Sequence, residues 1–313
     1  MSLLILVPIL IGVGVSSQTA INSRLRYYAK SPYLASAISF FIGTIFLLIL
    51  TYLTLHTLTI SKSVFTNNPW WIWIGGFTGA FSLTVNILLF AKLGSKQAAV
   101  LPISGQILAS IVIDQFGLFD SPITKLSLLK FIGLILVLLG MLSIVDLFNF
   151  GKKDFNLEQK EPHQLSWQFL GISSGVLFAI QTATNGRLGT VLHSPIQAAL
   201  ITFSIGTILL IILSVITKAP ILSLFNKKAH SSKLELWGWF GGIIGGINIV
   251  LIAWLAPLIG TGAVVVISLF GQLGFSILID QLGLFKSEKI LASRLQLIGV
   301  VIMLLGIVMI YFI

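Results

Sequence analysis

The chain has 313 residues, of which 56% are hydrophobic and only 9% are charged, and its mean hydropathy is +1.04. So few ionic groups cannot cover the surface of a water-soluble globule, which predicts an integral membrane protein. The net charge of +10 does not indicate nucleic-acid binding, because the basic residues lie in short connections between apolar runs. The absence of cysteine excludes disulfides, thiolate nucleophiles and zinc–thiolate sites.

Ten apolar runs are long enough to cross a bilayer as helices. They cover residues 2–22, 33–55, 70–91, 97–116, 128–148, 166–187, 195–217, 236–256, 262–281 and 293–313. The first run lacks the basic start of a cleavable signal, so it is predicted to be the first transmembrane helix. No segment alternates apolar and polar residues as a membrane barrel does. The predicted fold is all-α and integral to the membrane, with ten transmembrane helices.

The end of the fourth run occurs a second time, 166 residues later. Residues 105–119 read GQILASIVIDQFGLF and residues 271–285 read GQLGFSILIDQLGLF, with ten of fifteen positions identical. The sequence QTAINSRL at 18–25 likewise returns as QTATNGRL at 181–188. This repetition predicts two homologous five-helix repeats, residues 1–148 and 166–313, joined by a charged cytoplasmic linker at 149–165.

An odd number of helices in each repeat makes the second repeat enter the membrane from the opposite side, so the repeats are predicted to be inverted. Fifteen of the 19 Lys and Arg residues lie in the connections between runs 1 and 2, 3 and 4, 5 and 6, 7 and 8, and 9 and 10. The positive-inside rule places these connections in the cytoplasm and both termini outside.

Two aspartates, Asp114 and Asp280, lie near the end of the repeated stretch, each eight residues after a glutamine, Gln106 or Gln272. Eight residues span about 12 Å along a helix, so glutamines near the membrane centre would place the aspartates near opposite membrane faces. The aspartates are candidates for gating or proton coupling. The alternative is that each aspartate only ends its helix and stabilises the turn that follows.

Uncharged amides inside the apolar runs are the candidates for binding a solute. They are Gln106, Gln272, Asn86, Asn248, Gln18 and Gln181. The alternative role for each is interhelical hydrogen bonding, worth about 0.6 kcal/mol on average in lipid. Asn22 and Asn185 are expected instead to end their helices at the interface. The spacings Gly75-x3-Gly79 and Gly241-x3-Gly245 predict close packing between helices.

The sequence contains no nucleophile with a neighbouring base, no phosphate-binding loop and no histidine cluster, since all four histidines lie in connections. It therefore predicts no catalytic residue, no cofactor, no metal site and no enzymatic activity.

Three motifs resemble the YdcZ-like family of bacterial inner-membrane proteins, within the drug/metabolite transporter superfamily. They are Q-x-A-x-N-x-R-L at 18–25, P-W-W-x-W-x-G-G at 69–76 and G-Q-x7-D at 105–114. The resemblance implies antiparallel five-helix units, here two copies fused in one chain, in a bacterial inner membrane. It supplies no list of substrate-binding residues, and the second copy lacks the double tryptophan.

Inverted repeats with polar residues near the membrane centre are the architecture of alternating-access transporters. We therefore expect a secondary transporter or exporter of a small metabolite or drug-like solute. A passive channel is one alternative. A structural or lipid-interacting membrane protein, whose polar stripes only hold helices together, is another. The expected partners are a small-molecule solute and the lipid bilayer, without nucleic acid; a homodimer is left open.

Overall fold

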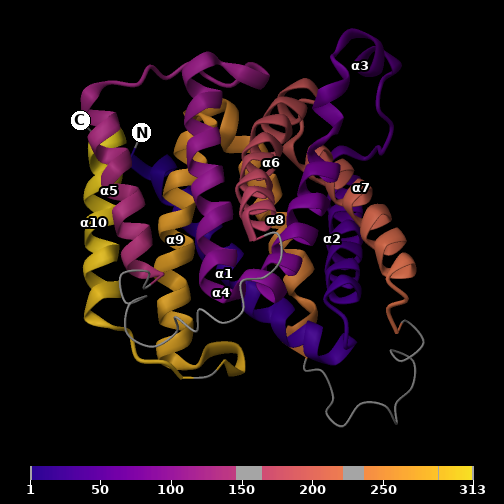
Figure 1. Ribbon diagram of the computed structural model, residues 1–313. Helices are drawn as coiled ribbons and strands as arrows, with labels where there is room; N and C mark the ends of the chain where they lie inside the picture. Colours follow the sequence, from indigo (N-terminus) through magenta and orange to yellow (C-terminus); the bar gives the residue numbers. More distant parts are fainter. Residues whose placement is uncertain (1, 146–163, 221–235, 288, 312–313) are drawn as a thin grey trace.

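The computed structural model describes residues 2–145, 164–220, 236–287 and 289–311 (Figure 1). All regular structure in these ranges is helical. The long helices are α1 Ser2–Ala29, α2 Pro32–Leu55, α4 Gly75–Phe116, α5 Leu128–Ile144, α6 Gln164–Val191, α7 Pro195–Ile216, α8 Gly241–Ile259, α9 Thr261–Leu282 and α10 Arg294–Tyr311. The short ones are α3 Lys62–Asn67, η1 Trp70–Trp73, η2 Leu118–Asp120, η6 Leu236–Trp239 and η7 Leu284–Lys286. The predicted linker at 149–165 lies outside the described residues except for its last two.

The repeated Ser-Pro pairs begin α2 and α7. The Ser31 hydroxyl accepts a hydrogen bond from the backbone N–H of Leu34 at 3.3 Å, and the Ser194 hydroxyl accepts one from Gln197 at 3.2 Å. A proline follows each serine at the start of the helix, where a missing N–H removes no helical hydrogen bond. The sequence similarity thus reproduces the same helix start in both halves.

Helix α4 is one helical segment of 42 residues, where the sequence predicts two spans at 70–91 and 97–116. Both Leu89 and Leu101 nevertheless pack against the same residue of α6, Gly171. A straight helix would separate residues twelve positions apart by about 18 Å, so the chain turns back between them, as Figure 1 shows. The two predicted spans correspond to the two limbs of α4, and the short connection between them remains helical. The first limb starts later than predicted, because residues 70–73 form the turn η1.

The α2–α7 pair brings equivalent residues of the two halves into contact. Thr44 and Thr207, which are 163 residues apart, share a hydrogen bond of 2.8 Å between their hydroxyls. The rings of Phe40 and Phe203, with the same separation in sequence, stack with centroids 4.6 Å apart. Contacts between equivalent residues are typical of an interface beside a two-fold axis. The α2–α7 interface is thus a contact that each half makes with the same residues.

The α5–α10 pair follows the same reciprocal rule. Gly133 lies against Gly306, and Gly140 lies against Gly299. Gly299 and Gly306 are the counterparts of Gly133 and Gly140 at the 166-residue offset, so exchanging the halves turns one contact into the other. Glycine at both positions lets the two backbones approach closely.

Seven helices of the described chain are long and apolar enough to cross a membrane. They are Leu6–Ala29, Pro32–Leu55, Ala98–Phe116, Pro195–Ile216, Gly241–Ile259, Thr261–Leu282 and Arg294–Tyr311, and Leu128–Ile144 is a shorter apolar helix. The protein is thus a helical, multi-pass membrane protein, as the composition predicts. Helix α6 is not one of the seven, and it carries Gln181, Thr182, Thr184 and Asn185 buried inside the protein.

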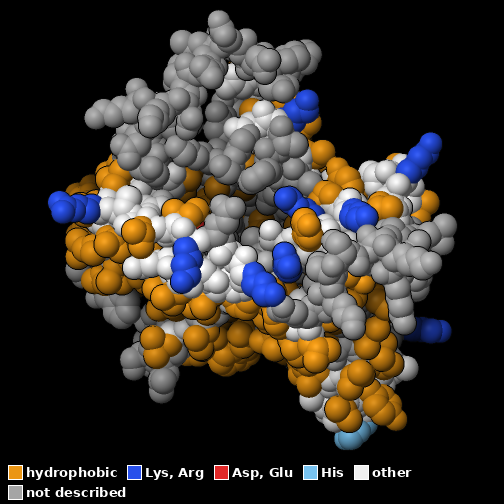
Figure 2. All heavy atoms as spheres, turned by 90° about the horizontal axis from the view of Figure 1, so that it is seen from below, with side chains coloured by type: hydrophobic (Ala, Val, Ile, Leu, Met, Phe, Trp, Pro, Cys, Tyr) orange, Lys and Arg blue, Asp and Glu red, His pale blue; other side chains and the backbone are white. Residues whose placement is uncertain are grey.

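Basic side chains gather at one end of the helices. The α1–α2 and α9–α10 connections and the end of α7 lie at the lower end in Figure 1, and the face seen from below carries many Lys and Arg side chains, with no Asp or Glu visible on it (Figure 2). These connections and the helix ends beside them contain Arg24, Arg26, Lys30, Lys218, Lys286, Lys289 and Arg294.

Candidate functional site

Each half places a glutamine against a glycine of the other half. Gln18 of α1 lies on Gly245 of α8, and its counterpart Gln181 of α6 lies on Gly79 of α4. A methyl group on either glycine would collide with the facing amide. The Gly-x3-Gly spacings do serve close packing, as predicted, and the two amides fill the space that the missing side chains leave.

Asn22 and Asn185 lie one helical turn further along the same interfaces, against Gly241 and Gly75 respectively. The expectation that they end their helices is wrong, because α1 continues for seven residues beyond Asn22 and α6 for six beyond Asn185. Asn185 Oδ1 accepts a hydrogen bond from the Thr202 hydroxyl at 2.7 Å. Asn185 Nδ2 and Asn22 Oδ1 are buried without a hydrogen-bond partner among the described residues. Both side chains are interior parts of the contact between the halves.

Asn86 and Asn248 do not occupy equivalent places. Asn86 Oδ1 accepts a hydrogen bond from the Ser174 hydroxyl at 3.0 Å, which joins α4 to α6. Asn248 is 5% exposed and packs against Gly14 of α1, and its Nδ2 has no hydrogen-bond partner in the part of the chain that the structure describes. Position 252, the counterpart of Asn86, holds a buried isoleucine. The two asparagines therefore belong to different interfaces and do not form one site.

Gln106 and Gln272 lie where helices of the two halves cross closely. The backbone of Gln106 in α4 lies against Gly175 of α6, and the backbone of Gln272 in α9 lies against Gly12 of α1. Both glutamines are half-buried, and neither side-chain amide has a hydrogen-bond partner in the described part of the chain. These amides can donate to and accept from a bound molecule or water.

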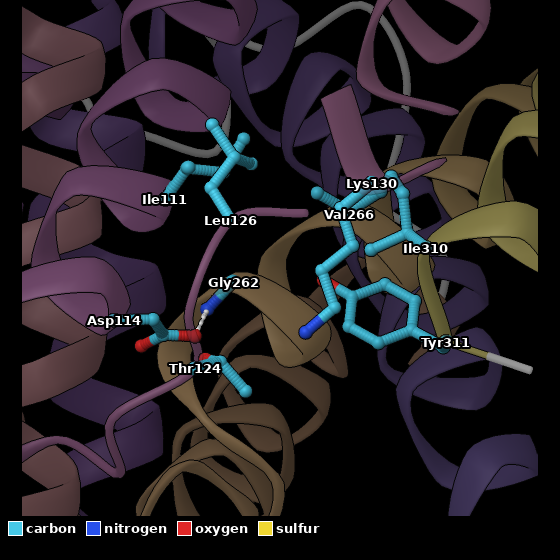
Figure 3. A pocket seen from close by; sticks show the side chains of 9 residues that line it. All are labelled: Ile111, Asp114, Thr124, Leu126, Lys130, Gly262, Val266, Ile310 and Tyr311. Carbon is cyan, nitrogen blue, oxygen red and sulfur yellow. Dashed lines mark hydrogen bonds between the residues drawn. The ribbon is translucent and has the colours of Figure 1, made fainter. Parts of the chain in front are cut away.

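The Asp114 carboxylate binds the start of helix α9, which belongs to the other half. Its Oδ1 accepts hydrogen bonds from the Thr261 N–H at 2.9 Å and from the Ser121 hydroxyl at 2.7 Å. Its Oδ2 accepts one from the Gly262 N–H at 2.7 Å (Figure 3). The residue that precedes α9 is Gly260, which has no side chain to cap the helix. Asp114 therefore supplies the missing cap, where a negative charge also meets the positive end of the helix dipole.

Gly260 is suited to this contact in two ways. Its backbone has φ 91° and ψ 154°, a conformation that L-residues with a side chain rarely adopt. A Cβ atom at this position would also lie 2.7 Å from Asp114 Oδ2. A larger residue would both strain the backbone and push the carboxylate away from α9.

A small cavity opens beside the Asp114 carboxylate, between α4, α5, α9 and α10 (Figure 3). It has about 40 Å³ of water-accessible volume and is lined by Ile111, Asp114, Thr124, Leu126, Lys130, Gly262, Val266, Ile310 and Tyr311. One water needs roughly 10–15 Å³ of such volume, so the cavity can admit water to the carboxylate.

Asp280, the counterpart of Asp114, lies near the other end of α9, roughly 28 Å away along the helix axis. Its side chain is exposed and has no hydrogen-bond or ion-pair partner in the described part of the chain. The two aspartates thus lie at opposite ends of the helix bundle, and only Asp114 holds the other half.

An ion pair reinforces the end of the bundle at which Asp114 lies. Arg187 Nε of α6 lies 3.1 Å from Asp120 Oδ2 of η2, again joining the halves. Arg187 Nε has no hydrogen-bond partner within the described ranges, so its contact with Asp120 is electrostatic, and the partial exposure of both side chains makes this ion pair weak. The counterparts at the opposite end are Arg24 and Lys286, two cations that cannot pair with each other. The Arg24 guanidinium lies instead 5.4 Å from the ring centroid of Tyr27.

Comparison with known proteins identifies the family. The profile of the family described as "Putative inner membrane exporter, YdcZ" matches residues 3–143 and again residues 166–309. The chain belongs to the YdcZ family. Because the YdcZ profile matches twice, this is a fused two-copy protein of that family, and its general function as a membrane transporter follows.

Two further comparisons bear on the YdcZ assignment. The search of curated proteins finds no match. A solved structure entitled "Crystal structure of protein" is 15% identical with a TM-score of 0.65, over 99% of this YdcZ chain and 96% of the other chain. At this level of identity the likeness indicates a common fold alone.

Sequence reasoning missed the partners of Asp114 in this YdcZ protein. Ser121, Thr261 and Gly262 hold the carboxylate, and none of them is part of a recognisable motif. The one available signal is the short Gly-Thr-Gly stretch at 260–262 between two apolar runs, which indicates a helix start without its own side-chain cap.

Proposed function

We propose that the protein is a secondary exporter of a small metabolite or drug-like solute, which works by alternating access between two inverted five-helix repeats. The ten membrane crossings of this arrangement are the nine long helices of the described chain, with α4 crossing twice through its two limbs. The YdcZ family assignment supports the class of function. No enzymatic step forms part of the proposal.

The observation that carries the proposal is the reciprocal crossing of α1 with α9 and of α6 with the second limb of α4. Gly12 lies against Gly271 and Gln272 is beside it, while their counterparts Gly175, Gly105 and Gln106 form the equivalent crossing. If a two-fold axis relates the two equal crossings, the conformation of each half can be exchanged with that of the other, which is the basis of rocking in inverted-repeat transporters.

Orientation follows from the positive-inside rule. The basic face of Figure 2 is taken as cytoplasmic, which places both termini, Asp114 and the Arg187–Asp120 pair near the outer face. Asp280 is then near the cytoplasmic face.

The solute is proposed to contact Gln106 and Gln272, because their amides are half-buried at the crossings and have no partner in the described chain. Gln18, Gln181, Asn86 and Asn248 lie in the surrounding interfaces, where they support the crossing helices. Asp114 and Asp280 are proposed to control the gates. Lipid is the second partner of the protein.

Flux through purified protein in liposomes tests the proposal. Saturable uptake that is accelerated by solute on the opposite side is expected of a carrier. Uptake that rises linearly with solute concentration would instead favour a passive channel. Absence of flux for every solute in a broad metabolite and drug panel would favour a structural or lipid-interacting protein.

A further inference from the structure

The turns after Asp114 and Asp280 have the same backbone structure. Gly117 has φ 62° and ψ 31°, and Gly283 has φ 66° and ψ 35°. In both turns the backbone N–H of the residue ten positions after the aspartate donates to the aspartate's backbone oxygen at 2.9 Å. Because the turns are equal, neither depends on where the aspartate side chain is bound.

The side-chain contacts of the two turns differ. Ser121 donates its hydroxyl to Asp114, whereas its counterpart Ser287 donates to the backbone oxygen of Ile279 at 3.1 Å. The Asp114 carboxylate is 5% exposed and holds α9, while the Asp280 carboxylate is exposed and holds nothing among the described residues. Since local sequence and turn geometry are shared, the difference lies in the position of the opposite helix.

The first half contains the counterpart of the helix start that Asp114 holds. Gly260 and Thr261 correspond, at the offset of 166 residues, to Gly94 and Ser95 at the junction between the limbs of α4. We propose that Asp114 and Asp280 are alternating helix caps: when Asp114 leaves α9, Asp280 binds the backbone N–H groups that follow Gly94. This inference rests on the proposed function, because it assigns the two caps to the two states of an alternating-access cycle.

The exchange couples the two gates, because each half supplies one aspartate and the backbone N–H groups that the aspartate of the other half binds. In the present state the outer end is held by Asp114 and by the Arg187–Asp120 ion pair, and Asp280 has no partner in the described part of the chain. A new helix start at Ser95 would separate the limbs of α4 as α8 and α9 are separated now.

Disulfide trapping tests the exchange directly, because the protein has no cysteine of its own. The Ser121 and Thr261 hydroxyls are 3.0 Å apart, so the variant S121C/T261C can form a bridge that locks the present state. The matched variant S95C/S287C reproduces this pair at the opposite end. The control variant S121C/S287C carries two of the same cysteines at opposite ends of the bundle.

Each variant is oxidised in liposomes, and free thiols are then counted by the mass shift from a polyethylene-glycol maleimide. Both matched pairs are expected to lose nearly all their thiols and the control pair to keep them. A minor state populated at about 0.1–10% suffices, because the bridge accumulates. In a protein with all four substitutions, oxidation is expected to leave two free thiols per chain, since only one cap forms at a time.

The exchange is wrong if S95C/S287C stays reduced under conditions that fully oxidise S121C/T261C, or if all four thiols disappear together. If S95C/S287C does not fold, the rate at which an external thiol reagent labels the single-cysteine variant T261C is measured instead. Asp280→Ala should lower that labelling several-fold by removing the competing cap, and unchanged labelling overturns the proposal. If solute flux is measured but S95C/S287C forms no disulfide, the proposed exporter function stands and the proposed exchange of caps is wrong. If S95C/S287C forms a disulfide but no solute gives flux, the exchange of caps stands and the exporter function is wrong.

Discussion

Gly262 donates its backbone N–H to the Asp114 carboxylate at 2.7 Å, although 148 residues separate the two in the chain. A helix normally takes its cap from the residue just before it, and here Gly260 leaves that position without a side chain. The end of α4 and the start of α9 are therefore tied together, so a movement of either helix must break or carry this contact.

Asp114→Ala should lower the free energy of unfolding by about 1–3 kcal/mol, because two buried N–H groups lose their acceptor. Asp280→Ala is the matched control, since the Asp280 carboxylate has no partner in the described chain. Its thermal midpoint in detergent should equal that of the unchanged protein. Equal midpoints for both variants would show that the Asp114 cap contributes nothing to stability.

Gly260→Ala should destabilise the protein by about 1–3 kcal/mol, because alanine strains the backbone at φ 91° and its Cβ approaches Asp114. Gly274→Ala in the middle of α9 meets no atom within 4 Å and should be neutral or stabilising by about 0.5–1 kcal/mol. Thermal unfolding of the two variants side by side checks the contrast. A Gly260→Ala protein as stable as Gly274→Ala would contradict the cap geometry.

Gln106→Leu and Gln272→Leu should weaken solute binding while leaving the thermal midpoint almost unchanged. Leucine has a volume similar to that of glutamine and fits apolar surroundings, and the substitution removes an amide that has no partner in the described chain. Ligand-induced shifts of the thermal midpoint, measured first for the unchanged protein across a solute panel, provide the assay. Normal binding by both variants would make the glutamines packing residues.

A reporter active only in the periplasm should be active when fused after Ile313 and silent when inserted near Glu158. The expectation rests on the fifteen basic residues in the connections assigned to the cytoplasm. The opposite activities would invert the assignment of the two faces, including those of Asp114 and Asp280.

If transport is driven by protons, the double variant Asp114→Asn/Asp280→Asn should lose proton-driven flux while keeping exchange of solute across the membrane. These are the two carboxylates within the described transmembrane helices, and the cavity beside Asp114 gives water access to one of them. Flux driven by a pH gradient in liposomes is the measurement. Undiminished flux would remove both residues from coupling.

Much of the architecture could be predicted because it depends on local patterns. The apolar runs and the Gly-x3-Gly spacings are patterns of neighbouring residues, and the structure has long helices over the runs that it describes and close packing at the spacings. The sequence predicts two separate helices at 70–91 and 97–116, whereas the structure has the single helical segment α4. How the connection between the two limbs folds depends on the packing of the limbs, which the local sequence does not specify.

The difference between Asp114 and Asp280 could not have been predicted from sequence. Both follow the same five residue types at the same spacing, and both lead into the same turn. What separates them is the helix start in the other half: the Asp114 carboxylate accepts from the Thr261 and Gly262 N–H groups, whereas Asp280 has no hydrogen-bond partner in the described part of the chain. Two copies of one motif can therefore make different side-chain contacts within one molecule.

The placement of Gln18 and Gln181 on glycines of the opposite half has a consequence for biogenesis. The ribosome completes α4 before it makes α6, so the groove at Gly79 enters the membrane without the amide that fills it. The first half must remain inserted but loosely assembled until the second is synthesised, and neither half can complete its interior alone. Two separately translated halves should then reassemble only when both are present in one bilayer, and quality-control proteases should remove a solitary half.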